Sequence, residues 1–542
     1  MTDRTLEFKD HYDLAVVGGG IHGAAVAWEA ASRGMSVVLV EGKDFASGAS
    51  ANSLKIIHGG LRYLQTLDIR RARESAREQL RLGRLAPHLV RPLPCVMPTY
   101  RELKKSRLAL GLGLELYKWF ISPTKRASVL GGGDRLITRE ELYRLVPVRL
   151  ANGITGGALW HDAQVYNSER LVIEFVMSAR SLGADTVNYA HVDGVSTEAG
   201  RVRMVRLTDR LAKREYEVSC STVVYATGAY GRDLGGEPGT RFVRAVNLIL
   251  PVTWGRHALG VAVPATRARG ARQTRLLFFV PWRDHTIVGT WYFPDRPELG
   301  DRITRQELQE CLNDVHGVLG DRRFTGDAVD SVHVGRLPLR AGSSQDEPKL
   351  RERFEVRGPE RSGGPRGAYW IIGTKYTTAR QAAAHAIDEL LRTGTGMAAA
   401  EPEQERSLDG GGMTCFLGYL EHMQTAFGDR FPPDVVYRLV RNYGTKTDAI
   451  LRYGHERPEL FEPIPGAVGT LKAEVAYVID HELAYCLDDL LFRRTDLATL
   501  KRPHPDTVRY CREQMSARYG WDPSERDRQT ELVAAYFDKV TS

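Results

Sequence analysis

Residues 13–23 read DLAVVGGGIHG, an apolar run that ends in a glycine-rich turn, and an Ala-rich helical pattern follows through Arg33. In this order of strand, turn and helix, each glycine of the turn has a separate task. Gly18 permits the tight turn, Gly20 lets a pyrophosphate approach the backbone, and Gly23 lets the helix pack closely on the strand. A phosphate then lies at the helix N-terminus. The stretch therefore predicts the first half of a dinucleotide-binding βαβ unit.

A second strand and an acid complete this unit. Residues 36–40 read SVVLV and end at Glu41, 18 residues after the last glycine of the turn. An acid at this position bonds the adenosine ribose hydroxyls and disfavours a 2′-phosphate, so NADP is a poor fit. Further along, an apolar strand runs into Ala226, Thr227 and Gly228, where small residues let the backbone lie against a nucleotide. Glu41, Thr227 and Gly228 are therefore predicted cofactor contacts.

The segment after this acid favours FAD over NAD. Residues 47–64 read SGASANSLKIIHGGLRYL, are rich in small and hydroxyl side chains such as Ser50, and pass into His-Gly-Gly. Gly59 and Gly60 let the backbone approach a flavin. Histidine exchanges protons near neutral pH, so His58 is a candidate general base; a structural histidine that bonds a loop carbonyl is the alternative.

Composition describes a globular protein with two or three lobes. The chain has 542 residues, of which 42% are hydrophobic and 26% charged. Its formal net charge is +8, with basic and acidic residues mixed along most of the sequence and without a nucleic-acid-binding module, so no nucleic acid partner is expected. The 6 cysteines are scattered without metal-ligand spacing, which predicts core thiols and no metal site.

The N-terminus and one apolar segment indicate where in the cell the protein is expected. Residues 1–10 are polar and lack the apolar core of a secretory signal, so a cytoplasmic protein is expected. Residues 108–121 read LALGLGLELYKWFI between basic flanks, which is too short for a spanning helix. Such a segment fits a membrane interface, here the cytoplasmic face of the inner membrane, and it fits an internal lid or core helix equally well.

Four segments carry a resemblance to a known family. They are residues 18–34 (GGGIHGAAVAWEAASRG), residues 55–64 (KIIHGGLRYL), residues 373–380 (GTKYTTAR) and a C-terminal region with RNYG at 441–444. Over nearly its whole length the chain resembles the FAD-dependent glycerol-3-phosphate dehydrogenase family, of the aerobic, quinone-linked type, as a divergent member. The resemblance implies FAD as cofactor and a helical accessory domain at the C-terminus.

The resemblance also implies roles for individual residues. The segment with His58 lies under the flavin ring in the family, where the histidine is a candidate base and where Arg62 and Tyr63 approach the anionic substrate. Gly373 and Lys375 lie by the flavin, and the lysine charge stabilises the reduced, anionic flavin or binds a substrate oxygen. These implications make His58, Arg62 and Lys375 the predicted catalytic residues.

Two departures concern the substrate. The family reads Gly-x-Arg-Pro-Leu where this chain has Gly335-Arg336-Leu337-Pro338-Leu339, and on a strand a shift of one residue turns a side chain to the other face. We expect Arg62 with Arg336 or Arg340 to clamp a phosphate. The family also has Gly-Thr-Thr-Asp where residues 289–292 read GTWY. A different hydroxy or sugar-phosphate substrate therefore stays open beside sn-glycerol 3-phosphate.

The expected reaction is oxidation of sn-glycerol 3-phosphate to dihydroxyacetone phosphate by hydride transfer to flavin N5, with electrons passed to quinone. An oxidase that uses oxygen is an alternative, and a catalytically silent flavin-binding partner belongs to another class. Peripheral membrane contact and a homodimer are compatible with the resemblance.

The predicted fold is α/β: a two-dinucleotide-fold, glutathione-reductase-like FAD domain, an antiparallel β cap domain and a C-terminal all-α domain. Residues 276–281 and 286–290 are expected strands of the cap sheet. The expected divisions are 12–75, 160–245 and 335–400 for the discontinuous FAD-binding domain, 76–159 and 246–334 for the cap, and 410–540 for the helical domain.

Overall fold

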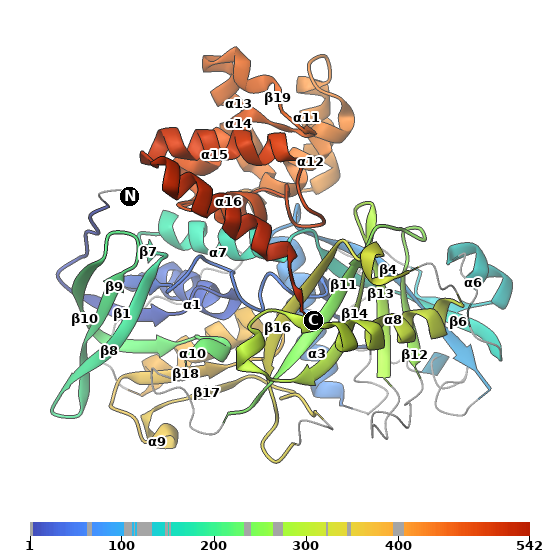
Figure 1. Cartoon of the computed structure of the whole chain (residues 1–542). Helices are drawn as coiled ribbons and strands as arrows, with labels where there is room; N and C mark the ends of the chain where they lie inside the picture. Colours follow the sequence, from blue (N-terminus) through green and yellow to red (C-terminus); the bar gives the residue numbers. More distant parts are fainter. Residues whose placement is uncertain are drawn as a thin grey trace.

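The computed structural model divides into a lobe built on a largely parallel sheet, a second lobe built on a mostly antiparallel sheet, and a C-terminal helical domain at the top of the view in Figure 1. This confirms the predicted fold class. The structure describes residues 4–61, 68–101, 111–112, 114–115, 133–146, 150, 153–231, 240–263, 275–320, 324–343, 348–393 and 406–541.

The first sheet has the order β17-β18-β10-β1-β2-β7, and its five strands from β18 to β7 run parallel. Strands such as β1 are apolar on both faces because both faces are covered. Strand β17 joins the edge in the antiparallel sense. The bounds are β1 (Tyr12–Val17), β2 (Val37–Val40), β7 (Asp185–Val187), β10 (Arg214–Tyr225), β17 (Glu355–Arg357) and β18 (Ala368–Ile372).

Different layers cover the two faces of this sheet. Leu14 and Val16 of β1 pack against helices, whereas Ala15 and Val17 pack against a β-hairpin on the opposite face. This alternation follows from the two-residue period of a strand. The helices are α1 (Ile21–Ser32), α7 (Ser168–Ser181) and α10 (Ala379–Arg392), and the hairpin strands are β8 (Ala190–Glu198) and β9 (Arg201–Asp209).

The second sheet forms the predicted cap and has the order β16-β11-β14-β13-β12-β4-β6-β3, with β5 beside β6. Its pairs are antiparallel except for β12 with β4. Helix α8 (Arg305–Leu319) packs on one face and begins at a capping box of Thr304 and Glu307. The strands are β3 (Ile56–Ile57), β4 (Val90–Tyr100), β5 (Arg135–Ile137), β6 (Ile154–Val165), β11 (Phe242–Leu250), β12 (Ala258–Val263), β13 (Arg275–Trp282), β14 (His285–Pro294) and β16 (Ser331–Pro338).

The two sheets are built from alternating parts of the chain. The expected divisions at residues 160, 245 and 335 fall inside β6, β11 and β16, all of which belong to the cap sheet. Further helices lie among these elements: the long helix α3 (Ile69–Leu85), the shorter helices α6 (Arg139–Leu145) and α9 (Pro359–Ser362), and the 3-10 helices η2 (Gly228–Tyr230), η5 (Pro297–Leu299) and η6 (Gly326–Ala328).

The C-terminal domain has a separate hydrophobic core and is mostly helical. It departs from the predicted all-α character in one β-hairpin, β19 (Pro463–Ile464) with β20 (Ala467–Leu471). The last strand, β21 (Val540–Thr541), leaves the domain and pairs with β15 (Ile303–Thr304) of the cap. The helices are α11 (Phe416–Phe427), α12 (Pro433–Tyr443), α13 (Thr447–Glu456), α14 (Lys472–His481), α15 (Pro505–Tyr519), α16 (Pro523–Phe537), the π-helix η10 (Asp489–Arg494), and the 3-10 helices η7 (Asp409–Gly411), η8 (Gly444–Lys446) and η9 (Pro458–Phe461).

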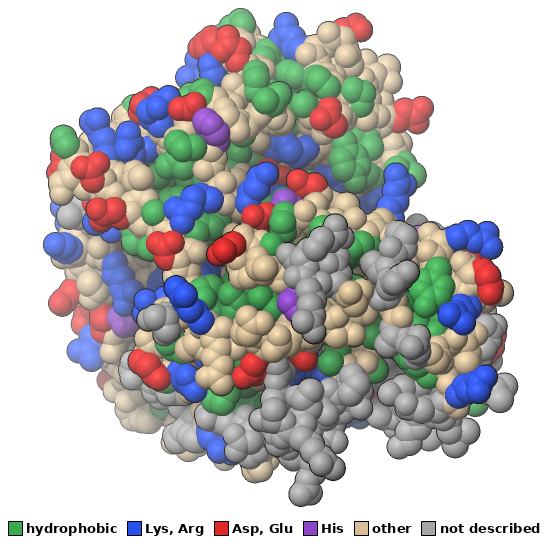
Figure 2. Space-filling view, turned by 45° about the vertical axis from the view of Figure 1, so that its right-hand side comes forward, with side chains coloured by type: hydrophobic (Ala, Val, Ile, Leu, Met, Phe, Trp, Pro, Cys, Tyr) green, Lys and Arg blue, Asp and Glu red, His purple; other side chains and the backbone are tan. Residues whose placement is uncertain are grey.

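The helices and the surface charge of the described residues concern two kinds of partner, membranes and nucleic acids. None of the described helices is long and apolar enough to cross a membrane. The apolar segment at residues 108–121 lies outside the described residues except at 111, 112, 114 and 115. Lys and Arg side chains are interspersed with Asp and Glu over the face shown in Figure 2, in keeping with the mixed charge of the sequence.

Candidate functional site

A cavity of about 510 Å³ lies between the parallel sheet and the cap sheet. Glu41, Tyr225 and Trp370 line it from the first sheet, and Asn247 and Thr290 line it from the second. Such a position, at the carboxyl ends of parallel strands and under a second lobe, is where α/β folds bind their ligands.

The glycine-rich turn forms one wall of this cavity. Gly18 has a φ of +107°, which favours glycine, and its N–H donates to the carbonyl of Val40 at 2.8 Å. Helix α1 begins at Ile21, after Gly20, an N-cap residue that has no side chain, and its first turn carries no acid. Its first N–H groups and the positive end of its dipole are therefore suited to a phosphate.

Glu41 ends strand β2 and contacts the same turn. One carboxylate oxygen accepts from the Gly19 N–H at 2.6 Å, and the other accepts from the Lys43 N–H at 2.8 Å. Burial raises the pKa of Glu41 in spite of these two amides. The carboxyl group is thus fixed beside the phosphate turn, with further acceptor capacity on the cavity side.

Four cavity residues carry buried polar atoms without a hydrogen-bond partner among the described residues: His22 Nε2, Asn52 Oδ1, Trp370 Nε1 and Arg336 Nη2. Burial lowers the pKa of His22 to about 4, so its ring is neutral near pH 7. Buried polar atoms are normally hydrogen-bonded, so this wall fits a ligand that offers both donors and acceptors. A dinucleotide such as FAD meets that requirement.

Lys375 lines the same cavity from the loop after β18. Burial lowers its pKa to about 7, and the charge of Arg71 acts in the same direction. The preceding Gly373 lies so close to α1 that an added Cβ would be 2.1 Å from His22 Nε2. Ser50 faces the same region, and its hydroxyl accepts from the Ile21 N–H at 3.0 Å.

His58 is oriented by a buried acid. Its Nδ1 lies 3.1 Å from Asp162 Oδ2, and the Gly59 N–H donates to the other carboxylate oxygen at 2.8 Å. Burial alone would raise the pKa of Asp162, but the bonds from His58 and Gly59 outweigh it and the pKa is lowered. The ionised acid therefore holds a proton on Nδ1 and leaves Nε2 as the proton acceptor.

The predicted site residues separate into those at the cavity and those beside it. Gly23 lies behind the turn, and His58, Gly59 and Gly60 lie around Asp162 rather than among the described residues that line the cavity. Arg62 and Tyr63 lie outside the described residues. The cavity brings together Gly18, Gly20, Glu41, Ser50, Thr227, Gly228, Arg336, Gly373 and Lys375.

Arg336 lines the cavity but is engaged with an acid. Its Nε lies 3.1 Å from Asp295 Oδ1. On β16 it is opposite Arg244 of β11, whose guanidinium bonds Glu307 of α8, and Leu337 occupies the next position. Leu337 lines the cavity as well, so the one-residue shift leaves an apolar residue next to Arg336 at this wall. Its substrate-binding role stays a prediction.

Sequence reasoning missed three polar residues near the cavity. Asp162 orients His58, and Thr290 donates to Asn247 Oδ1 at 2.8 Å. Asn247 in turn donates to the carbonyl of Asn52 at 3.1 Å. These partners come from distant strands of the cap, so local spacing gives no signal for them.

Comparison with known proteins identifies the family. Residues 13–385 match the family described as FAD dependent oxidoreductase, and residues 404–526 match the C-terminal domain of alpha-glycerophosphate oxidase. The chain is 32% identical over 543 residues to glycerol-3-phosphate dehydrogenase 2 of Mycobacterium tuberculosis, with 98% of this chain and 88% of that protein covered. The chain belongs to the glycerol-3-phosphate dehydrogenase family of FAD-dependent oxidoreductases. Its cofactor is accordingly FAD.

Two further proteins, one compared by sequence and one by structure, are similar to this member of the glycerol-3-phosphate dehydrogenase family. The chain is 31% identical over 347 residues to alpha-glycerophosphate oxidase of Enterococcus casseliflavus, with 61% of this chain and 55% of that protein covered. The structure of the Bacillus halodurans glycerol-3-phosphate dehydrogenase complexed with FAD has a TM-score of 0.77 and 22% identity, and covers 98% of this chain and 95% of that chain. This structural likeness supports the fold.

The lowered pKa of Lys375 predicts a lysine that titrates near neutral pH in the FAD-free protein. After reductive methylation with ¹³C-formaldehyde, we expect one dimethyl-lysine NMR signal to titrate with a midpoint of about 7. This signal is absent from Lys375→Arg. Because the folded pKa lies below the unfolded one, this lysine's contribution to stability rises with pH between about 7 and about 10. If no signal that titrates near pH 7 is lost in Lys375→Arg, the lowered pKa of Lys375 is contradicted.

Proposed function

We propose that this chain oxidises sn-glycerol 3-phosphate to dihydroxyacetone phosphate and passes the electrons to a quinone. The observation that carries the proposal is a cavity suited to a dinucleotide, together with the Asp162-oriented His58, which lies four residues along the chain from the lining residue Leu54. The full-length relatives named glycerol-3-phosphate dehydrogenase support the choice of substrate.

FAD would be held by the N-terminus of α1 at its pyrophosphate, by Glu41 at its ribose, and by Ser50, Thr227 and Lys375 along the rest of the cavity. When bound, FAD supplies the hydride acceptor that alcohol oxidation needs. The unpartnered polar atoms of His22, Asn52 and Trp370 offer further bonds to it. This assignment accounts for the buried polar atoms of the cavity wall.

In this proposal the proton of the substrate hydroxyl goes to His58 Nε2. Asp162 keeps the other ring nitrogen protonated and stabilises the imidazolium that forms. No described residue bonds Nε2, so that nitrogen is available to the substrate. Lys375 supplies positive charge on the cavity wall where negative charge develops.

Phosphate recognition separates two candidate substrates. Glycerol 3-phosphate requires guanidinium groups at its phosphate, and Arg62 is the predicted one, with Arg336 as partner. The ion pair of Arg336 with Asp295, and the apolar Leu337 beside it, favour a second candidate, a different hydroxy or sugar-phosphate substrate whose binding depends less on Arg336. Arg340 is exposed and suits a surface role as well as a clamp.

The electron acceptor and location form the finer part of the proposal. The net charge of +8 suits a peripheral position at an anionic membrane surface, where a quinone is available. We place the protein at the cytoplasmic face of the inner membrane, as a homodimer. Oxygen is the alternative acceptor, since one relative carries the name alpha-glycerophosphate oxidase.

The proposal predicts fast anaerobic bleaching of the flavin absorbance by glycerol 3-phosphate in stopped flow. Glycerol and a panel of other hydroxy-acid and sugar phosphates serve as comparison substrates. A fast phase with glycerol 3-phosphate alone supports the first candidate. A fast phase with another phosphate alone would replace it by the second, and no bleaching by any of them would contradict an alcohol oxidation at this site.

The His58–Asp162 pair predicts a large effect of Asp162→Asn. Loss of the charge that orients His58 should lower the rate of flavin reduction by roughly 100-fold or more, while FAD content stays at the wild-type level. Asp134→Asn is the matched control, because Asp134 Oδ1 lies 3.1 Å from His161 Nδ1 in a second pair of a histidine with a buried aspartate in the cap. Equal reduction rates in the two variants would remove His58 from the proton transfer.

A further inference from the structure

The loop of residues 41–46 encloses the middle glycine of the phosphate turn. Glu41 accepts from the Gly19 N–H at 2.6 Å, and the Ala46 N–H donates to the Gly19 carbonyl at 3.0 Å. The ring of Phe45 packs so closely that a Cβ added to Gly19 would lie 2.4 Å from Phe45 Cδ1. The conformation of this loop therefore determines the position of both the ribose acid and the phosphate turn.

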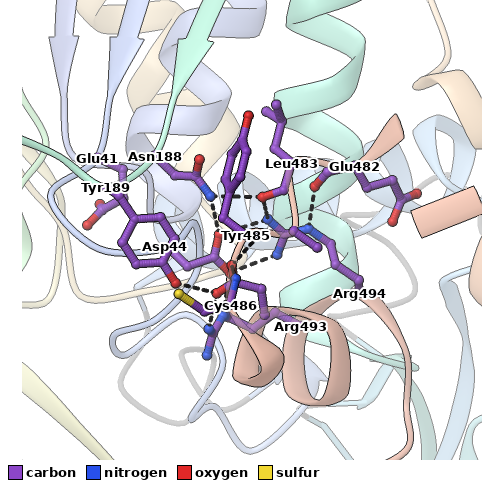
Figure 3. A network of polar contacts seen from close by, with 12 residues as sticks. Glu41, Asp44, Asn188, Tyr189, Glu482, Leu483, Tyr485, Cys486, Arg493 and Arg494 are labelled. Carbon is purple, nitrogen blue, oxygen red and sulfur yellow. Dashed lines mark hydrogen bonds and ion pairs between the residues drawn. The ribbon is translucent and has the colours of Figure 1, made fainter. Parts of the chain in front are cut away.

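Asp44 is the buried anchor of the 41–46 loop, at 1% exposure. Its carboxylate accepts from both terminal nitrogens of Arg494, at 2.7 and 2.8 Å, and from Arg493 Nε at 2.5 Å. Asn188 Nδ2 adds a further bond at 2.8 Å. Figure 3 shows these side chains converging on Asp44. The two guanidinium groups hold the pKa of Asp44 well below its usual range, against the effect of burial.

The two arginines belong to the C-terminal domain and are fixed there independently. Arg493 and Arg494 end the π-helix η10. Arg493 also bonds Asp488 at 2.7 Å and Asp489 at 2.6 Å, and Arg494 Nε donates to the carbonyl of Glu482 at 2.6 Å. The 41–46 loop is therefore held by side chains whose positions are set in another domain.

We propose that Arg493 and Arg494 are positioning residues for FAD: by holding Asp44 they fix the 41–46 loop in its cofactor-binding conformation, so that the C-terminal domain governs FAD retention. The inference rests on the placement of FAD proposed above. Asp44 precedes Phe45 in the chain, and the Phe45 ring packs closely on Gly19. A shift of the Asp44 carboxylate is therefore transmitted through Phe45 to the phosphate turn. A fork of two guanidinium donors defines the direction of a carboxylate, which a single lysine does not.

The competing explanation is an ion pair that stabilises only the contact between domains. Both explanations predict a lower Tm when a partner is removed, because an uncompensated buried charge remains. They differ in the Kd for FAD, which changes only if the loop conformation changes. The test therefore measures FAD binding to the full-length protein after the cofactor has been removed.

FAD is titrated into wild type, Asp44→Asn, Arg494→Gln and the double variant, and binding is followed by flavin fluorescence. We expect each single variant to raise the Kd by about tenfold or more. Arg438→Gln is the matched control, because Arg438 is a largely buried arginine of the same domain that bonds Glu474 and Asp496 and lies outside the contacts of the 41–46 loop. It should lower Tm and leave the Kd within about twofold of wild type.

A Kd within about twofold of wild type in the Asp44 and Arg494 variants, with a lowered Tm, would overturn the proposal. If these variants do not fold, Asn188→Ala removes one bond to Asp44 and leaves every charge in place; we expect it to raise the Kd about threefold or more, and an unchanged Kd would overturn the proposal equally. The titration needs no substrate, so its result is separate from the reduction of wild type by glycerol 3-phosphate.

Discussion

The close contact between strand β1 and helix α1 is the constraint on which the rest of the structure depends. A Cβ added to Gly23 would lie 1.8 Å from the carbonyl oxygen of Gly18, so the helix starts immediately behind the end of the strand. This contact aims the N-terminus of α1 into the cavity rather than past it. Strand β18 and its following loop approach the same helix end, where Gly373 meets His22. A phosphate-bearing cofactor is the ligand that such a helix end suits.

Buried charges join the three parts of the molecule around this cavity. Arg170 of α7 is fully buried and pairs with Glu174 on its own helix and with Glu482 of the C-terminal domain. Lys55 and Glu169 form another buried pair beside the cavity wall. Removal of one partner from such a pair typically costs about 3–5 kcal/mol, so these contacts define the arrangement of the domains more than they add to its net stability. The cavity therefore has walls from two lobes whose positions are set by specific charges.

The sequence predicted what local patterns encode. The glycine turn, the acid at Glu41 and the two cap strands follow from spacing and alternation over short stretches, and strands β13 and β14 confirm the expected runs at 276–281 and 286–290. The hairpin of β19 and β20 was missed because its strands are too short to show a period.

Long-range partners lie beyond such reasoning. The bond between Asp44 and Arg494 joins residues 450 positions apart, and that between His58 and Asp162 joins residues 104 apart. No periodicity or motif specifies which acid a given histidine or arginine will meet, because that choice depends on the assembled domains. The face of the sheet on which Arg336 lies is likewise set by the register between β11 and β16.

The most direct test is a crystal structure of the protein with FAD bound. We expect the pyrophosphate at the N-terminus of α1, a ribose hydroxyl bonded to Glu41, and the isoalloxazine ring beside Ser50 and Lys375, within reach of His58. A flavin ring in the reverse orientation, or one whose reactive edge is separated from His58 by the cap sheet, would contradict this placement.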